Sequence, residues 1–260
     1  MPFHPVAAEK LSHAVIRQIE LLILRGILRP GERLPSERDL AERFNVSRPS
    51  LRDALSALQD VGLLKAKPGA GIYVADVLGG AFSTALIALF SRHDEAVFDY
   101  LSFRRDMEGL AAERAAVFAS DIDLQVIQTI LGKMEAAQTK PNPNAELEAA
   151  LDAQFHMAII EASHNVIMLH MMRSMYDLLR GGVFYNRQIM FKRRASRDAI
   201  VAQHRTINEA LQARAPDAAR AAVEAHLDFV EQALVEQQKS ERNQEIAKQR
   251  LQHEKREMER

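Results

Sequence analysis

The stretch LRPGERLPSERDLAERFNVSRPSLRDALSALQDVGLL, residues 28–64, decides the fold of the N-terminal part of the chain. Ser36 is followed three positions later by Asp39, which is the spacing of a capping box and predicts the start of a short helix. Ser47 predicts the start of the next helix, because Pro49 is tolerated in a first helical turn. Two short helices joined by a tight turn indicate a helix-turn-helix, whose second helix enters the major groove of DNA.

The flanking sequence extends this motif on both sides. Before it, residues 11–25 carry apolar side chains at helical spacing. After Gly62, residues 63–74 read as two short strands around a glycine-rich tip, which predicts a small β-wing. Polar side chains at the start of the second helix can hydrogen-bond phosphates or base edges, and Arg pairs well with guanine. These candidates are Ser47, Arg48, Ser50 and Arg52, flanked by Arg38 from the preceding helix. The alternative is that the arginines form the solvated faces of ordinary amphipathic helices.

Composition favours a helix-rich chain of two domains. The 260 residues include 47% hydrophobic and 6% aromatic residues, with 11 Gly and 9 Pro. The chain has no Cys, which excludes disulfides and thiolate chemistry and agrees with a reducing compartment. We find no signal sequence and no apolar run of the roughly 18 residues that a membrane span needs, so we expect a cytoplasmic protein. Residues 1–75 have 11 basic and 8 acidic residues, whereas residues 76–236 have 16 and 22. This distribution suits a polyanion-binding N-terminal domain.

The larger C-terminal part is predicted to be an all-α bundle, because helical apolar periodicity is repeatedly interrupted by short breaks. The predicted breaks lie at Ser120-Asp121, residues 141–144, Gly181-Gly182 and residues 215–217. We therefore expect the fold class to be mainly α, with an N-terminal winged helix-turn-helix and a C-terminal helical bundle. The charged tail, residues 237–260, is expected to be a solvated helix or disordered.

Four side chains in this bundle are candidate metal ligands. Asp152 and His156 are four residues apart, a spacing that places both on one face of a helix. His204 and His226 lie in helical, largely apolar contexts that favour inward-facing positions. Three imidazoles and one carboxylate suit zinc, and nickel or manganese are also possible. The alternative is that each histidine is a structural residue of the core or surface.

Residues 28–64 closely resemble the DNA-binding domain of the GntR family of transcription regulators, and residues 97–236 resemble the FCD domain of its FadR branch. The resemblance implies a homodimer that binds a palindromic operator of TGGT-NNN-ACCA type. It also implies DNA contacts from Arg38, Ser47, Arg48, Ser50 and Arg52, with the wing tip at Pro68 and Gly69 reaching the minor groove. In metal-binding members an Asp-x-x-x-His pair precedes two later histidines, which Asp152, His156, His204 and His226 match.

Arg104 precedes Glu108 by four residues, so the two can form an ordinary ion pair along a helix. In the FadR branch, the resemblance implies that the Arg meets the carboxylate of an effector beside the metal. Similarity to pyruvate-responsive repressors of this branch implies a repressor of central carbon metabolism that pyruvate releases from DNA. Regulators of lactate or glycolate use share the architecture and stay open as alternatives.

The expected domains are a winged helix-turn-helix at residues 1–76, a linker with a helix leading into the bundle at 77–96, the FCD bundle at 97–236 and the tail. A helical-bundle metalloenzyme is an alternative from another class, but it leaves the winged domain unexplained, and no general base is evident near the ligands. A repressor that responds to metal alone is a third possibility. We expect a regulator rather than an enzyme.

Overall fold

A computed structural model describes residues 11–76, 84–90, 92–140, 142, 144–180 and 194–258. The chain divides into two compact units, an N-terminal unit of residues up to Ser83 together with Leu169–Ser174, and a C-terminal unit that contains the rest of the chain from Thr84 onward. Three sequence predictions lie outside the described residues, namely the linker at 77–83, the break at Gly181-Gly182 and the N-terminal segment before Leu11.

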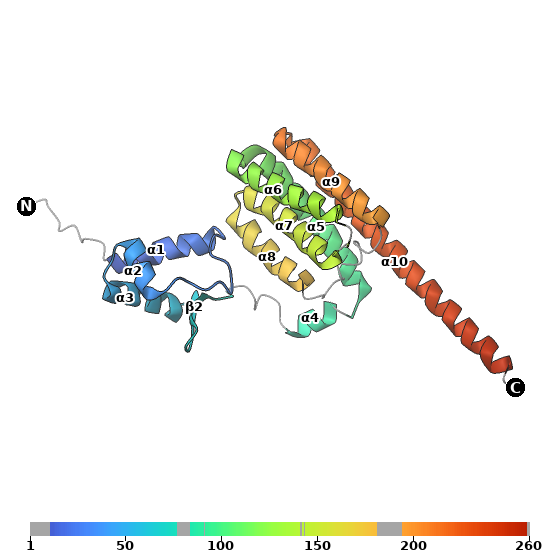
Figure 1. Ribbon diagram of the computed structural model, residues 1–260, viewed down its shortest axis with the longest axis horizontal. Coiled ribbons are helices and arrows are strands. Elements are labelled where there is room, and N and C mark those ends of the chain that lie inside the picture. The colour runs from blue at the N-terminus through green and yellow to red at the C-terminus, as the bar shows by residue number, and fades with distance from the viewer. Residues whose placement is uncertain are drawn as a thin grey trace, which may run out of the picture. The chain divides into compact units, whose positions relative to one another are not determined.

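The described residues from Leu11 to Asp76 form three helices and one hairpin (Figure 1). The strands pair antiparallel, with Leu64 opposite Val74 and Lys67 opposite Gly71. Gly69 and Gly71 have φ angles of 70° and 103°, which let the chain reverse between the strands. The elements are α1 (Leu11–Leu24), α2 (Glu37–Phe44), α3 (Arg48–Asp60), β1 (Leu64–Lys67) and β2 (Gly71–Val74).

Local side-chain caps set the two helices of the motif. The Ser36 hydroxyl accepts a hydrogen bond from the Asp39 amide at 3.2 Å, and α2 ends at Asn45, whose left-handed backbone turns the chain. The Ser47 hydroxyl accepts from the Ser50 amide at 3.3 Å and starts α3. The caps at Ser36 and Ser47 therefore fall where the sequence predicts them.

Apolar side chains from α1, α3 and the hairpin form the core of this unit. It includes Val15, Ile19, Leu51, Leu55, Leu58, Leu64 and Val74, all nearly inaccessible to solvent. The apolar face of α3 packs against this core, and its polar face points away from the core. The predicted winged helix-turn-helix is confirmed.

The C-terminal unit consists of helices throughout its described residues (Figure 1). The long helix α5 packs closely against α10 and also contacts α7 and α9. The elements are α4 (Thr84–Phe90), α5 (Asp94–Phe118), α6 (Asp121–Gln138), α7 (Ala145–Ala162), α8 (Val166–Arg180), α9 (Arg194–Gln212) and α10 (Pro216–Met258). The predicted all-α bundle is confirmed.

Three predicted breaks coincide with helix starts. Ser120 and Asp123 form a reciprocal capping box at the start of α6, and Asn144 accepts a hydrogen bond from the Leu147 amide at the start of α7. Pro216 is the first residue of α10. The predicted charged tail is helical through Met258, because α10 continues without interruption and its last part extends past the other helices of the unit (Figure 1). None of the described helices is long and apolar enough to span a membrane.

Candidate functional site

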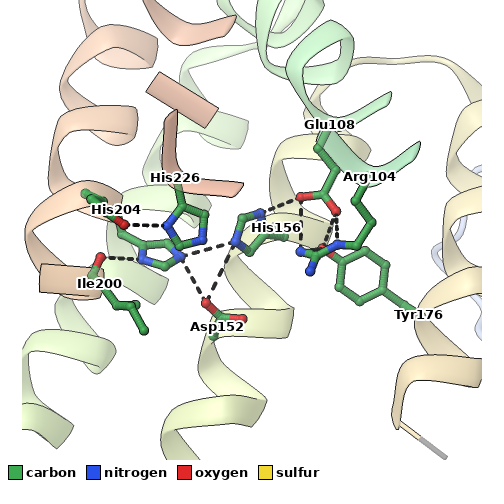
Figure 2. A network of polar contacts seen from close by, with 9 residues as sticks. Arg104, Glu108, Asp152, His156, Tyr176, Ile200, His204 and His226 are labelled. Carbon is green, nitrogen blue, oxygen red and sulfur yellow. Dashed lines mark hydrogen bonds and ion pairs between the residues drawn. The ribbon is translucent and has the colours of Figure 1, made fainter. Parts of the chain in front are cut away.

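Asp152, His156, His204 and His226 meet inside the C-terminal unit (Figure 2). Asp152 and His156 lie one turn apart on α7, while His204 comes from α9 and His226 from α10. All four side chains are buried, and one potential ligand atom from each lies within 4.8 Å of the others. The structure thus brings together all four residues that the sequence suggested as metal ligands.

Each histidine of the cluster has its Nδ1 held by an acceptor outside the cluster. His204 Nδ1 donates to the Ile200 carbonyl at 2.7 Å, and His226 Nδ1 donates to Gln203 Oε1 at 2.9 Å. His156 Nδ1 lies 2.6 Å from Glu108 Oε2. Because a neutral imidazole carries one proton, these contacts leave each Nε2 with a lone pair.

The lone pairs and the Asp152 carboxylate face one another across short distances. His204 Nε2 lies 3.3 Å from His156 Nε2 and 3.2 Å from Asp152 Oδ1. Burial lowers the pKa of His156, although contact with Glu108 raises it, and burial together with His204 and His156 lowers the pKa of His226 well below its ordinary value. Neutral imidazoles are the form that binds metals, and a divalent cation between these atoms would offset the repulsion of their lone pairs. This donor set fits a divalent metal.

A second buried group of polar side chains adjoins the cluster through Glu108 (Figure 2). Arg104 Nε donates to Glu108 Oε1 at 2.6 Å, and the Tyr176 hydroxyl donates to the same oxygen at 2.8 Å. Arg104 Nη2 also donates to the Tyr176 oxygen at 3.0 Å. Burial alone would raise the pKa of Glu108, but the charge of Arg104 and the contact with His156 outweigh it and hold this pKa well below its ordinary range. The Arg104 guanidinium, which is 1% exposed, is thus linked through the Glu108 carboxylate to the cluster of candidate metal ligands.

Comparison with known proteins assigns both units. Residues 11–74 match the bacterial regulatory proteins of the gntR family, and residues 99–229 match the FCD domain. The chain belongs to the GntR family. Its members are DNA-binding transcription regulators, so the expectation of a regulator rather than an enzyme is confirmed. Domains of the FCD type often bind a metal, in line with the donor set described above.

Relatives of similar length support this assignment. The Glc operon transcriptional activator of Escherichia coli K12 is 33% identical over 86% of this chain and 89% of its own length. A putative L-lactate dehydrogenase operon regulatory protein of the same strain is 34% identical over 86% of each chain. The structure of a Streptococcus agalactiae GntR protein, 23% identical, covers 84% of this chain and 98% of its own with a TM-score of 0.50, and so shows a shared fold.

The side chains suggested for DNA contact lie on the outer face of the GntR-family domain. Arg48 is exposed at the start of α3, and Pro68 and Gly69 are exposed at the wing tip. Arg38 Nε lies 3.7 Å from Asp39 Oδ1, and Arg52 Nε donates to Glu37 Oε2 at 2.8 Å. Ser47 and Ser50 hydroxyls lie 2.9 Å apart. DNA contact by these residues stays a prediction.

Sequence reasoning missed the partners that join the two groups in the FCD domain. It paired Arg104 with Glu108 but did not connect Glu108 to His156, which lies on another helix. Tyr176 and Gln203 were not singled out, although each hydrogen-bonds a residue of the site. The spacing of Arg104 and Glu108 was the one sequence signal for this network.

Proposed function

We propose that this GntR-family regulator is a repressor that binds a palindromic operator as a homodimer and is released by a small carboxylate, with pyruvate as the effector. The observation that carries the proposal is the buried Arg104, joined to the metal-ligand cluster through Glu108. A buried guanidinium beside metal ligands suits a ligand that has both a carboxylate and a neighbouring oxygen.

Asp152, His156, His204 and His226 would hold the metal, and three imidazoles with one carboxylate favour zinc among the divalent ions. When bound, the metal supplies coordination positions for the oxygens of a 2-oxo or 2-hydroxy acid. Glu108, Gln203 and the Ile200 carbonyl orient the three imidazoles through their Nδ1 atoms. Arg104 would bind the carboxylate of the acid in the two-pronged geometry that guanidinium groups favour.

On DNA, the two copies would place α3 in successive major grooves, as the two-fold symmetry of the operator requires. Arg48 would reach a base edge or a phosphate. Arg52 would exchange its contact with Glu37 for one with DNA. Release follows only if the carboxylate binds the DNA-free arrangement of the dimer more tightly than the DNA-bound one.

L-Lactate is the second candidate effector. A relative 34% identical to this chain is named as a putative regulator of an L-lactate dehydrogenase operon. L-Lactate presents a carboxylate and an adjacent hydroxyl, so the same metal and guanidinium could bind it.

The test is fluorescence anisotropy of a labelled TGGT-NNN-ACCA duplex at fixed salt, because phosphate contacts make affinity depend strongly on salt. The zinc-loaded protein is titrated alone, with millimolar pyruvate and with millimolar L-lactate, and the zinc-free protein is titrated alone. We expect selective binding that pyruvate weakens at least about tenfold, as for a typical allosteric coupling. If L-lactate weakens operator binding and pyruvate does not, L-lactate is the effector. If operator affinity depends on zinc and on neither acid, the protein is a metal-responsive repressor.

Arg48→Ala is the matched variant for the DNA contact. It should weaken operator binding, by about 1–3 kcal/mol if Arg48 contacts a base, and leave zinc binding unchanged. His204→Ala should do the reverse, because His204 belongs to the buried cluster. An Arg48→Ala protein with unchanged operator affinity would remove this residue from the DNA interface.

A further inference from the structure

The outward face of α5 carries a line of apolar side chains. Phe103, Leu110 and Val117 follow one another at intervals of seven residues and are 37%, 36% and 55% exposed. Side chains seven apart lie nearly above one another on a helix. Helix α10 covers a different side of α5, where Arg105 pairs with Asp228 and a Cβ atom at Gly109 would lie 3.2 Å from Glu224. The line is therefore uncovered by α10.

Two opposite charges flank the centre of this line. Asp106 lies four residues before Leu110 and Arg114 four residues after it. Among the described residues, neither Asp106 nor Arg114 forms an ion pair, and the Arg114 Nε atom is buried without a hydrogen-bond partner. The Arg114 guanidinium instead lies over the Phe118 ring at 5.0 Å. An acid and a base on one face thus both lack a counter-ion among the side chains that the structure describes.

The order of these five residues is symmetric about Leu110. If a second α5 lies antiparallel against the first, with a two-fold axis at Leu110, Phe103 meets Val117 of the second copy. The same axis places Asp106 opposite Arg114 of the second copy, and each contact occurs twice, as in any isologous interface. A parallel arrangement would instead set equal charges side by side, which is unfavourable.

We propose that this face, defined by Phe103, Asp106, Leu110, Arg114 and Val117, is the surface through which two copies of the chain dimerise. The inference rests on the homodimer of the proposed function. It adds which face of α5 forms the interface and that the two α5 helices run antiparallel. Apolar contact in the middle of the helix pair excludes water, while the flanking ion pairs fix the antiparallel orientation. A partner of another sequence would have no reason to match a pattern that is complementary to itself.

Charge reversal tests the pairing, with the monomer–dimer constant of the full chain measured by analytical ultracentrifugation. Asp106→Arg places two like-charged pairs in the interface, as does Arg114→Glu, so each should raise the dissociation constant at least about tenfold. The double variant D106R/R114E restores opposite charges and should dimerise like the wild type. Both side chains lie on the outer face of α5, and circular dichroism checks that the variants keep their helices.

The outcomes separate this inference from the proposed function. A wild-type dimer that is unaffected by either single reversal would overturn the face but leave the homodimer in place. A wild-type monomer would overturn both. Single reversals that weaken the dimer without rescue in the double variant would overturn the antiparallel pairing of Asp106 with Arg114.

Cross-linking provides a second test that does not depend on charge, because the chain has no cysteine. Leu110→Cys lies on the proposed axis and should form a disulfide with its own copy under mild oxidation. Phe103→Cys should cross-link to Val117→Cys in a mixture, but not to itself, because two copies of residue 103 would lie about 21 Å apart at a helical rise of 1.5 Å. Leu251→Cys, on the exposed end of α10, is the control and should stay reduced. A Leu110→Cys protein that stays monomeric on gels would overturn the proposal.

Discussion

Glu108 contacts both halves of the candidate site. Its carboxylate accepts from Arg104 Nε and the Tyr176 hydroxyl through one oxygen and lies 2.6 Å from His156 Nδ1 through the other. Removing its charge would therefore change both the imidazole proposed to bind the metal and the guanidinium proposed to bind the carboxylate ligand. A carboxylate acceptor at Nδ1 also makes the opposite Nε2 more basic, which strengthens its bond to a metal.

Replacing Glu108 with Gln should weaken zinc binding about 10–100-fold in protein free of DNA and of carboxylate ligands. The amide oxygen can still accept from His156 Nδ1, so that the ring keeps its orientation but loses the effect of the negative charge. Competition with a chromophoric chelator measures the zinc affinity. Glu113→Gln on the same helix is the control, because Glu113 pairs with the exposed Arg220 and does not contact the cluster. Equal zinc affinity in the Glu108→Gln and wild-type proteins would limit this residue to a structural role.

At the scale of elements, the start of α6 carries an extended cap. Asp123 Oδ2 accepts from the Ser120 amide at 2.8 Å and from the Ser120 hydroxyl at 2.6 Å, and His164 Nε2 lies 3.0 Å from the same oxygen. Burial raises the pKa of Asp123, but the Ser120 hydrogen bonds and His164 outweigh it and lower this pKa overall. The cap thus depends on the ionised carboxylate.

Asp123→Ala should lower the free energy of unfolding by about 1 kcal/mol at pH 7. The pKa of Asp123 is lower in the folded than in the unfolded protein, so its carboxylate stabilises the fold fully at any pH above its pKa in the unfolded chain. This stabilisation is lost as the pH falls through its pKa in the folded protein. The difference between wild type and variant in urea unfolding should therefore shrink below about pH 4. Asp121→Ala, in the same helical turn, is the control and should cost only a few tenths of a kcal/mol, because its ion pair with Arg214 is exposed. A difference independent of pH would contradict the role of the charge.

The sequence predicted helix boundaries best where one side chain decides them locally. Ser36 and Ser47 cap helices through amides only three residues later. Pro216 starts α10 because backbone N–H groups in a first helical turn have no partner within the helix, so the N–H that proline lacks is not missed. Asp152 and His156 could be placed on one face because a single helix carries both. The position of His204 beside them depends on how α9 packs against α7, which helical periodicity does not specify, so resemblance to a family had to supply it.

The contact of Glu108 with His156 and Tyr176 could not be predicted for the same reason. It joins α5, α7 and α8, and each of these helices has several faces on which a polar residue could be buried. The i,i+4 spacing predicts the local ion pair of Arg104 with Glu108. The partner of the second Glu108 oxygen depends on which helix packs against α5, and the spacing does not specify that.

At the scale of the whole molecule, each unit has a core of its own. The four candidate ligands all belong to the C-terminal unit and come from α7, α9 and α10. A metal would therefore tie together three helices that are distant in sequence, and it would bind the folded unit far better than the unfolded chain. The N-terminal unit contributes no residue to the cluster.

Zinc should consequently stabilise the two units unequally. At a free concentration of 100 times its dissociation constant, it should add about 2.7 kcal/mol to the unfolding free energy of the C-terminal unit, and a chelator should remove this gain. Hydrogen exchange followed by mass spectrometry locates the effect: peptides from α7, α9 and α10 should exchange more slowly with zinc, while those from α1 and α3 should be unchanged. His204→Ala is the control and should show little response, because it removes a ligand from a buried set. Equal protection of α3 and α7 in the wild type would mean that zinc acts outside the four-residue cluster or that the two units unfold together.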